Sequence, residues 1–493
     1  MSPLTYPMVI GNHRPPVNPD RALEVRSPLS GDLLGLVSDA TPAEVHDAVS
    51  AAQHGFDETW RYATGSQRAQ LMHRLADLID MHADELGGLE TADNGKLLRE
   101  TTMQARFAAR NYRFFAGIAD KLTGRTIPMD NLSTFDYTLR EPVGVAALIT
   151  AWNSPMQLLA NKLAPALAAG NCVVVKPSEL APRSTIRLAE LIEEAGFPPG
   201  VFNVITGGHQ AGAALTADAR LGLISFTGSV ATGQAIAATA AKNLVPVTLE
   251  LGGKSPNIIF DDANLDRAVI GAVAGIFAAS GQTCIAGSRL LVQSNVYDEV
   301  VEHVTERART IRVGDPALDT TQMGPAANMA QHKRILSMIE VGLSSGAKLA
   351  CGGGAVRDPE LPDGLFIEPT VFVDVDPASR IAQEEIFGPV LSIIRFDTEA
   401  DAISIANGTE FGLAAGIWTE SLSRAHRVAR ELLAGMVWVN TYRSSAAQAP
   451  FGGVKKSGYG RERGLEAIDP YLRTKNVMVD LSDSVRDPFS IQT

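Results

Sequence analysis

The chain has 493 residues, which is more than one hydrophobic core accommodates, so two or three domains are expected. Apolar residues make up 45% and charged residues 20% of the sequence, an ordinary balance for a soluble globular protein. The net charge of −12 and the scattered basic residues disfavour nucleic acid and anionic membranes as partners.

The first long segment, residues 41–120, is predicted to be helical. Leucine and isoleucine recur in it at helical spacing, and Asp93-Asn94-Gly95 is a typical helix end. The recurring positions are Leu71, Leu75, Leu78, Ile79 and Leu86.

From residue 143 onward, apolar strands alternate with helices. Helices are expected at 155–171 and at 182–196, the second with Pro182 near its start and Gly196 just past its end. This alternation indicates a parallel sheet covered on both faces, as in dinucleotide-binding domains. The expected strands are 143–152, 172–178, 201–207, 222–228 and 246–253.

A second α/β region follows, with helices expected at 297–311 and 423–434. No long low-complexity linker separates the two regions, so we expect them to pack tightly with a cleft between them. The polar segment 121–142 interrupts the order and could pair with another subunit. The expected strands of the second region are 289–295, 347–353, 365–375, 389–396, 413–419 and 435–441.

Other features disfavour whole classes of protein. The longest apolar run, around residues 268–279, is far shorter than a membrane span, and the first residues lack the features of an export signal. Three cysteines, Cys172, Cys284 and Cys351, make no disulfide framework and fit a cytoplasmic location. No histidine and cysteine cluster has metal-ligand spacing, so no metal site is expected.

Cys284, in the run GQTCIAG, is the first candidate for chemistry. A lone cysteine is usually inert, but Gly281 and Gly287 flank this one and let backbone N–H groups approach a reacting atom. Upstream, Glu250 stands in the run LELGGKSP, where a carboxylate in a glycine turn could act as a base on water. The two residues together suggest a covalent thiolate intermediate that is then hydrolysed.

Two strand ends carry signals for nucleotide binding. The run FTGSVATG places Gly228 and Ser229 at a strand end and Gly233 at the start of a helix, whose N-terminus could bind a phosphate. In the run KPSE, Lys176 could reach a ribose or phosphate and Glu179 could accept hydrogen bonds from ribose hydroxyls. Either motif alone also fits a solvated turn, and the usual G-x-G-x-x-G fingerprint is absent.

An ATP-binding loop is disfavoured. Gly253-Lys254-Ser255 matches the end of that motif, but Thr248 stands where its first glycine is required. The segment also follows directly on Glu250, the candidate base. We therefore expect no ATP site.

Seven motifs in order resemble the aldehyde dehydrogenase superfamily. They are AWNSP (151–155), KPSE (176–179), FTGSVATG (226–233), LELGGKSP (249–256), GQTC (281–284), EEIFGPV (384–390) and PFGGVKKSGYGRERG (450–464). The helical segment before them, with ETADNGK at 90–96, fits as well. One departure is Ala151, where the family usually has proline, which would change the rigidity of the loop rather than the chemistry.

The resemblance implies a role for each matched residue. Cys284 matches the nucleophile, Glu250 the general base, and Asn153 the side-chain amide that forms an oxyanion hole with the Cys284 backbone N–H. Lys176 and Glu179 match the residues that hold the adenosine ribose. The full set matched to cofactor contacts is Trp152, Lys176, Ser178, Glu179, Gly228, Ser229, Gly233, Glu385 and Phe387.

The implied fold is α/β, with two Rossmann-like domains and a small β oligomerisation arm. The cofactor domain would comprise 1–120 and 142–252, the catalytic domain 253–450, and the arm 121–141 and 465–493. Family members are usually dimers or tetramers, so a homodimer or homotetramer is expected.

The cofactor is expected to be NAD. Glu179 would repel a 2′-phosphate and so favours NAD over NADP. Some relatives with this glutamate accept both, so NADP remains a possible second cofactor.

The substrate tunnel is expected to be wide and polar. Many family members that oxidise simple aliphatic aldehydes have aromatic rings at the positions of Ser154 and Ser445. Arg443 could pair with a carboxylate, hydroxyl or phenolate at the far end of the substrate, or instead form a salt bridge or a subunit contact. The predicted lining residues are Ser154, Leu158, Asn161, Thr283, Ile285, Arg443, Ser445 and Phe451.

The sequence therefore predicts oxidation of a polar, aromatic or carboxylate-bearing small aldehyde to its acid, by way of a thiohemiacetal and a thioester. One alternative is a semialdehyde dehydrogenase. A coenzyme-A-acylating enzyme is disfavoured by the Glu250 base, and a phosphate-dependent enzyme is disfavoured because hydrolysis needs only water. A cysteine esterase would leave the KPSE and EEIFGPV motifs without a purpose. A scaffold that has lost catalysis is disfavoured by the intact Cys284, Glu250 and Asn153.

Overall fold

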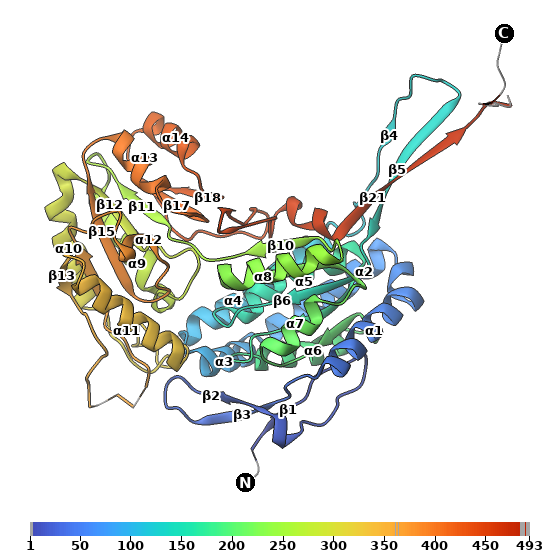
Figure 1. Ribbon diagram of the computed structural model, residues 1–493, viewed down its shortest axis with the longest axis horizontal. Coiled ribbons are helices and arrows are strands. Elements are labelled where there is room, and N and C mark those ends of the chain that lie inside the picture. Colours follow the sequence, from blue (N-terminus) through green and yellow to red (C-terminus); the bar gives the residue numbers. More distant parts are fainter. Residues whose placement is uncertain (1–2, 360, 363, 484–488, 490–493) are drawn as a thin grey trace.

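Two α/β bodies and a projecting arm make up the computed structural model, which describes residues 3–359, 361–362, 364–483 and 489 (Figure 1). The first body is built on a six-stranded sheet in the order β20-β10-β9-β6-β7-β8. All neighbouring strands are parallel except β20, which pairs antiparallel with β10. The strands are β6 (Val145–Ile149), β7 (Cys172–Lys176), β8 (Phe202–Val204), β9 (Leu221–Thr227), β10 (Val247–Glu250) and β20 (Gly458–Tyr459).

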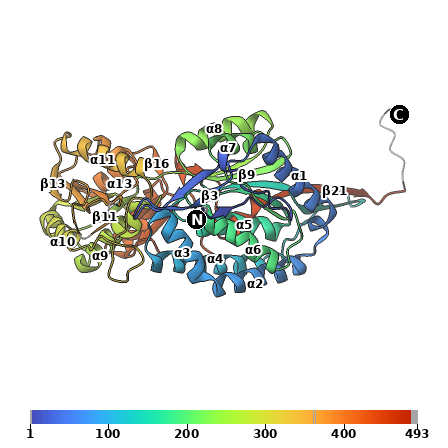
Figure 2. The same cartoon turned by 90° about the horizontal axis from the view of Figure 1, so that it is seen from below.

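Helices cover both faces of this sheet (Figure 2). One face carries α1 (Pro42–Glu58), α7 (His209–Thr216) and α8 (Val230–Lys242). The other carries α5 (Pro155–Ala169) and α6 (Arg183–Glu194), with α2 (Gly65–Met81), α3 (Ala83–Asn94) and α4 (Leu98–Ala116) packed outside them. Nearly every α5 residue is buried, because α5 lies between the sheet and the outer helices.

The second body has a seven-stranded sheet in the order β13-β14-β15-β12-β11-β17-β18. Only the β13/β14 pair is antiparallel. The strands are β11 (Pro256–Ile259), β12 (Arg289–Gln293), β13 (Lys348–Cys351), β14 (Thr370–Val373), β15 (Val390–Phe396), β17 (Ala414–Trp418) and β18 (Met436–Val439). Its helices are α9 (Leu265–Phe277), α10 (Tyr297–Arg309), α11 (Met329–Leu343), α12 (Arg380–Gln383), α13 (Glu399–Asn407) and α14 (Leu422–Glu431).

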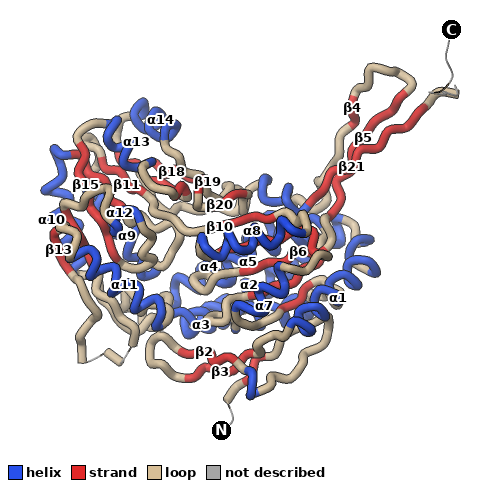
Figure 3. Tube along the Cα trace, in the orientation of Figure 1, coloured by secondary structure: helices blue, strands red, loops and turns tan. Residues whose placement is uncertain are grey.

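Smaller elements complete the chain. A three-stranded sheet near the N-terminus lies against the first body, and a two-stranded ladder lies near the second sheet (Figure 3). Their strands are β1 (Thr5–Tyr6), β2 (Leu23–Arg26), β3 (Leu33–Val37), β16 (Phe411–Gly412) and β19 (Val454–Lys455). The 3₁₀ helices are η1 (Pro19–Arg21), η2 (Trp60–Tyr62), η3 (Ala278–Gly281), η4 (Ser294–Val296) and η5 (Leu465–Tyr471).

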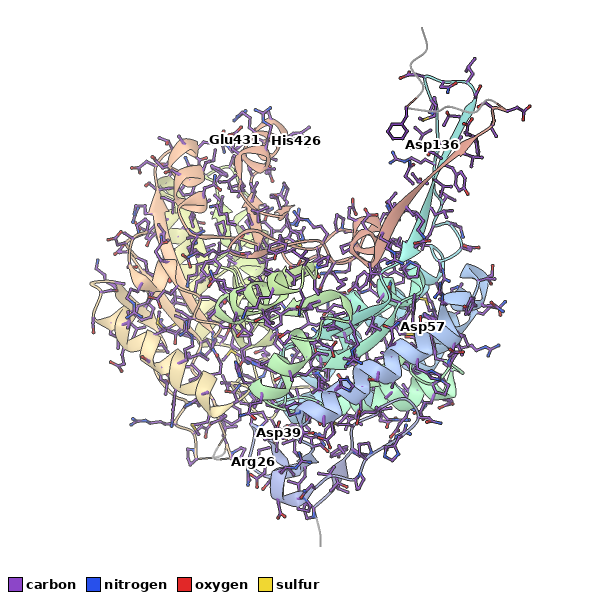
Figure 4. All side chains as sticks on the ribbon, turned by 45° about the vertical axis from the view of Figure 1, so that its right-hand side comes forward. Arg26, Asp39, Asp57, Asp136, His426 and Glu431 are labelled. Carbon is purple, nitrogen blue, oxygen red and sulfur yellow. The ribbon has the colours of Figure 1, made fainter. Side chains whose placement is uncertain are left out.

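The arm is an antiparallel sheet that projects from the first body, with Asp136 labelled on it in Figure 4. It consists of β4 (Thr126–Ile127), β5 (Thr134–Pro142) and β21 (Leu472–Asp480), and β5 pairs with β21 along its full length. Almost all of these residues lie in the two segments predicted to form an oligomerisation arm. The predicted arm also includes residues 484–488 and 490–493, which lie outside the described residues.

The predicted helices and strands are largely found in the structure, although the strand expected at 365–375 is shorter, at Thr370–Val373. Strand β11 and the N-terminal sheet were not predicted. The predicted domain limits stay a prediction. Within the described residues, no helix is long and apolar enough to span a membrane, and no group of three or more His, Cys, Asp or Glu could hold a metal ion.

Candidate active site

The loop between β6 and α5 carries Asn153, and the buried end of α3 fixes its backbone. Asn94 Nδ2 donates a 3.0 Å hydrogen bond to the Trp152 carbonyl. Lys96 Nζ donates to the Asn153 carbonyl and to Ser154 Oγ, both at 2.6 Å. Burial lowers the pKa of Lys96 to about 8. The ETADNGK motif therefore positions the Asn153 loop.

Cys284 follows a left-handed turn. Ala279, Ser280 and Gly281 have φ values of 54°, 53° and 67°, which is unusual for the two residues that carry a Cβ. Ser280 Oγ holds the turn by donating a 2.9 Å bond to the Gly324 carbonyl. A Cβ at Gly281 would lie 2.1 Å from the Gly388 carbonyl oxygen, so only glycine fits. The turn delivers Cys284, partly exposed, from the second body toward the first.

One hydrogen bond joins the Asn153 and Cys284 segments. Asn153 Nδ2 donates to the Gln282 carbonyl at 3.1 Å. Gln282 is fixed in turn, because its Oε1 accepts from the Ala327 N–H at 2.9 Å and its Nε2 donates to the Pro325 carbonyl at 3.3 Å. The side-chain amide of Asn153 thus contacts the Cys284 loop at Gln282, two residues before the thiol.

Glu250 is the last residue of β10 and is buried. Its Oε2 has no hydrogen-bond partner among the described residues. Burial, and then the nearby Glu462 carboxylate, raise the pKa of Glu250 well above its ordinary value, and Lys162 opposes the shift. Lys162 forms a buried ion pair with Glu462. A carboxyl with a raised pKa suits a base that exchanges protons near neutral pH.

The Cys284 thiol shares the electrostatic environment of these carboxylates. Burial, and then Glu385 and Glu250, raise the pKa of Cys284 to about 12, whereas Arg463 lowers it. The resting thiol is therefore protonated at neutral pH and needs a nearby base to become a nucleophile. Glu250 is close enough for their charges to interact and has a free carboxylate oxygen.

A cavity of about 490 Å³ opens at the carboxyl ends of β6, β7 and β9. Strands β7 and β8 lie on one side of β6, and β9 and β10 lie on the other, so the strand order reverses at β6. Doubly wound sheets bind nucleotides at this reversal, and the cavity lies there. The predicted cofactor residues Trp152, Lys176, Ser178, Glu179, Gly228 and Ser229 all line it.

The walls of this cavity suit a dinucleotide. Ser229 caps α8 by accepting a 3.2 Å bond from the Thr232 N–H, so the α8 N-terminus faces the cavity as an anion site. The Thr150 and Thr227 hydroxyls are buried on its lining without partners among the described residues. Gly233 lies outside the lining and packs on Leu251 instead, where a Cβ would come within 2.7 Å.

Lys176 and Glu179 lie together at the end of β7. Lys176 Nζ is 3.9 Å from Glu179 Oε2. The Lys176 ammonium is buried, whereas the Glu179 side chain is 43% exposed and faces the cavity as a hydrogen-bond acceptor. This pair can hold a ribose diol by one donor and one acceptor.

Glu385 and Phe387 come from the second body. Glu385 Oε1 accepts a 3.0 Å hydrogen bond from the Gly253 N–H, and burial raises the pKa of Glu385 to about 7. The Phe387 ring meets Trp152 edge-on, with centroids 5.4 Å apart. Neither residue lines the 490 Å³ cavity, but Phe387 contacts the loop that does.

The predicted tunnel residues separate into two groups. Ile285, Ser445 and Phe451 line a second cavity of about 210 Å³. In the first body, Ser154 is bonded to Lys96, Leu158 is buried, and Asn161 donates to Glu462 Oε2 at 3.1 Å. Asn161 is thus part of a polar hydrogen-bond network rather than of the lining of an open tunnel.

The other two predicted tunnel residues, Thr283 and Arg443, belong to neither group. Thr283 is partly exposed beside Cys284. Arg443 has a left-handed φ of 64° and forms no salt bridge with any described residue. The salt bridge considered as its alternative role is therefore absent from the part of the chain that the structure describes.

Sequence reasoning missed Lys96, Lys162, Glu462 and Arg463. Lys162 carried a signal, because it is a single charge in an otherwise apolar helix. Lys96 ends the ETADNGK motif, whose match to the family does not by itself indicate a contact with the Asn153 loop. Glu462 and Arg463 lie in the GRERG run directly after β20, and the pairing of Glu462 with Phe451 is not readable from periodicity.

The comparisons with known proteins agree with this architecture. The aldehyde dehydrogenase family matches residues 16–477. The putative aldehyde dehydrogenase DhaS of Bacillus subtilis is 46% identical over 93% of this chain and 92% of that protein. A betaine aldehyde dehydrogenase of Cereibacter sphaeroides is 44% identical over 92% of this chain and 93% of that protein.

Solved structures are equally similar. Betaine aldehyde dehydrogenase from Staphylococcus aureus, in complex with NAD+, has a TM-score of 0.97 and 38% identity, covering 99% of this chain and 97% of that one. PnpE from Pseudomonas sp. WBC-3 has a TM-score of 0.96 and 41% identity, covering 99% of this chain and 100% of that one.

The two α/β bodies with their arm define an aldehyde-oxidising oxidoreductase of the aldehyde dehydrogenase fold. The chain belongs to the aldehyde dehydrogenase family. The family and the fold predicted from the sequence are confirmed.

Proposed function

We propose that this protein oxidises a small aldehyde to its carboxylic acid with NAD as the electron acceptor and Cys284 as the covalent nucleophile. The observation that carries the proposal is the convergence of Cys284, Asn153 and Glu250 from three separate segments, with Asn153 directly after Trp152 on the lining of the 490 Å³ cavity. Each has the chemistry that one step requires.

In the first step, Glu250 accepts the thiol proton and the Cys284 sulfur adds to the aldehyde carbon. The carbonyl oxygen becomes an oxyanion that Asn153 Nδ2 and the Cys284 backbone N–H stabilise by donating hydrogen bonds. Loss of one such donor typically slows catalysis about 100- to 1000-fold. NAD, when bound, accepts the hydride that the oxyanion expels.

The second step is hydrolysis. The acyl group is then a thioester on Cys284. Glu250 releases the thiol proton to solvent and then removes a proton from a water molecule that attacks the thioester carbon. The acid leaves and the sulfur regains a proton. Burial of Glu250 keeps its carboxyl basic enough for this task.

NAD is the preferred cofactor in this proposal. The similar Staphylococcus aureus enzyme holds NAD+, and the cavity here offers the α8 N-terminus for the pyrophosphate and Lys176 with Glu179 for a ribose. A 2′-phosphate would place its charge near the Glu179 carboxylate, so NADP is the second choice.

The proposed substrate carries a polar, aromatic or carboxylate group at its far end. Ser154 and Ser445 give small polar walls, and Arg443 adds a positive charge. Betaine aldehyde, the substrate named for several relatives, is disfavoured because its trimethylammonium group would approach the positive charge of Arg463 in the cavity. A semialdehyde fits these walls better.

The rival reactions stay less favoured. Release of the acyl group to coenzyme A would leave the buried Glu250 carboxylate, whose Oε2 has no partner in the described part of the chain, without a purpose. A cysteine esterase would have no use for the cavity at the sheet switch. We also propose a homodimer or homotetramer, and a cytoplasmic location that fits three unpaired cysteines.

The test is formation of reduced nicotinamide by the purified protein, with NAD or NADP and a panel of aldehydes, in the absence of coenzyme A. We expect turnover with NAD, a lower kcat/KM with NADP, and none with Cys284→Ala. Turnover that survives in Cys284→Ala, or that depends on added coenzyme A, would refute the proposal.

A further inference from the structure

Arg463 lines the same cavity as Ile285, the neighbour of the reactive Cys284, and part of its guanidinium has no hydrogen-bond partner among the described residues. It is 5% exposed and has a left-handed φ of 58°. Its charge acts on Cys284, whose pKa it lowers, so the two groups share one site. The Arg463 side chain also lines the 210 Å³ cavity together with Ile285, the residue that follows Cys284.

Two aromatic rings and one hydroxyl fix the plane of this guanidinium. Its central carbon lies 4.5 Å from the centroid of the Phe451 ring and 5.5 Å from that of Phe107. Nη1 donates to Ser445 Oγ. Nε is fully buried and has no partner among the described residues, and Nη2 likewise forms no hydrogen bond with them. The Nε–Nη2 edge is therefore held in place and free.

No protein carboxylate neutralises Arg463 in the described chain. The two carboxylates whose charges raise the pKa of Arg463 are those of Glu462 and Glu250. Glu462 is already used, because it pairs with Lys162 and accepts from Asn161. Glu250 lies against the Gly452 backbone, where a Cβ would come within 2.6 Å of its Oε1. A buried cation with an unused donor edge is costly unless a ligand pairs with it.

Arg443 is a second cationic side chain with a buried nitrogen that has no hydrogen-bond partner among the described residues. Its Nη1 is buried without a partner in the described part of the chain. The charge of Arg443 lowers the pKa of Lys96, and the charge of Cys284 raises it. Lys96 itself is saturated by its contacts to Asn153, Ser154 and Gln104. The excess positive charge near the thiol therefore belongs to Arg443 and Arg463.

We propose that the substrate is an aldehyde with a carboxylate at its far end, and that the free Nε–Nη2 edge of Arg463 binds this carboxylate by two parallel hydrogen bonds. The inference rests on the proposed aldehyde oxidation and assigns its substrate class. The Nε–Nη2 edge of an arginine has two parallel donors, which match the two oxygens of a carboxylate. A hydroxyl or a phenolate has only one oxygen and cannot accept from both donors in this way. Phe451 and Ile285 contact the chain between the two ends of the substrate.

The test compares paired aldehydes on the wild type and on Arg463→Leu and Arg463→Lys. Suitable pairs are succinic semialdehyde with butanal, and 4-carboxybenzaldehyde with 4-methylbenzaldehyde. We expect Arg463→Leu to lower the ratio of kcat/KM between the charged and the neutral aldehyde by about 100-fold, mainly through KM, because two charge-assisted hydrogen bonds are lost. Arg463→Lys keeps the charge but not the fork, so the ratio should fall by an intermediate amount.

Arg430→Leu, on an exposed arginine of α14, is the matched control and should leave the ratio unchanged. A ratio in Arg463→Leu within about threefold of the wild type, or a wild type that prefers the neutral aldehydes, would overturn the inference. Thermal melting and NAD binding of each variant show that it is folded.

A second readout does not depend on turnover. Glutarate, which resembles the acid product, should slow alkylation of Cys284 by iodoacetamide in the wild type and not in Arg463→Leu. If no aldehyde is oxidised but this protection is seen, the proposed function fails while the carboxylate site stands. Equal protection, or none in either protein, contradicts the carboxylate site.

Discussion

At the scale of single residues, burial decides the chemistry of the site. It is the largest cause of the raised pKa of both Cys284 and Glu250, and each carboxylate near the thiol adds to the shift. A protonated thiol next to a proton acceptor is stable until substrate arrives. The residues that the reaction uses are therefore also the residues whose ordinary ionisation the fold disturbs.

The first prediction concerns pH. Glu250 acts in its deprotonated form, so hydrolysis should slow as the pH falls through its raised pKa. Glu462→Gln removes a neighbouring negative charge, which should lower the pKa of Glu250 and move the acid limb of the kcat profile to lower pH. Steady-state kcat measured from acidic to neutral pH checks the direction of the shift.

Glu466→Gln, on an exposed side chain nearby in the sequence, serves as the control and should leave the profile in place. An acid limb that stays fixed in Glu462→Gln, or moves to higher pH, would show that Glu250 does not set it.

At the scale of elements, the sequence predicts what has periodicity. The strands from residue 143 to 253 and the α2 and α5 helices are readable because their apolar residues repeat, and Gly95 and Gly170 end helices in the left-handed conformation that glycine adopts easily. Strand β11 was missed because four buried residues directly after a glycine turn cannot be distinguished from a loop.

The candidate site was predictable only in part. Cys284, Glu250 and Asn153 stand in motifs, so the resemblance could assign them. The left-handed turn at Ala279 and Ser280 has no sequence signal, since neither residue favours that conformation. Arg463 was hidden because its importance depends on which groups surround it, and these come from segments far apart in the chain.

At the scale of the whole molecule, the two bodies meet at the Asn153 and Cys284 segments and the arm extends away from both (Figure 1). The arm exposes large apolar side chains that its own sheet cannot cover. These are Leu132, Phe135, Leu139, Met478, Val479 and Leu481. Such a surface is typical of a contact with another subunit.

The second prediction therefore concerns assembly. Phe135 and Val479 lie opposite each other in the β5/β21 register. Replacing both with glutamate should place charges in the subunit contact and yield monomers, whereas the wild type should be a dimer or tetramer by light scattering. Leu422→Glu, at an exposed leucine of α14, is the control. A monomeric wild type, or an unchanged mass in the double variant, would contradict a role for the arm.

The most direct test of the central claim is to trap the acyl-enzyme. Glu250→Gln lacks the base for both steps, so at an alkaline pH, where solvent can take the thiol proton, mixing it with NAD and a suitable aldehyde should give a burst of reduced nicotinamide of about one equivalent per subunit, followed by slow turnover. Intact-mass and peptide analysis should then find the acyl group on Cys284. Undiminished steady turnover would show that Glu250 is not the base for hydrolysis. An acyl group on any other residue would show that Cys284 is not the nucleophile.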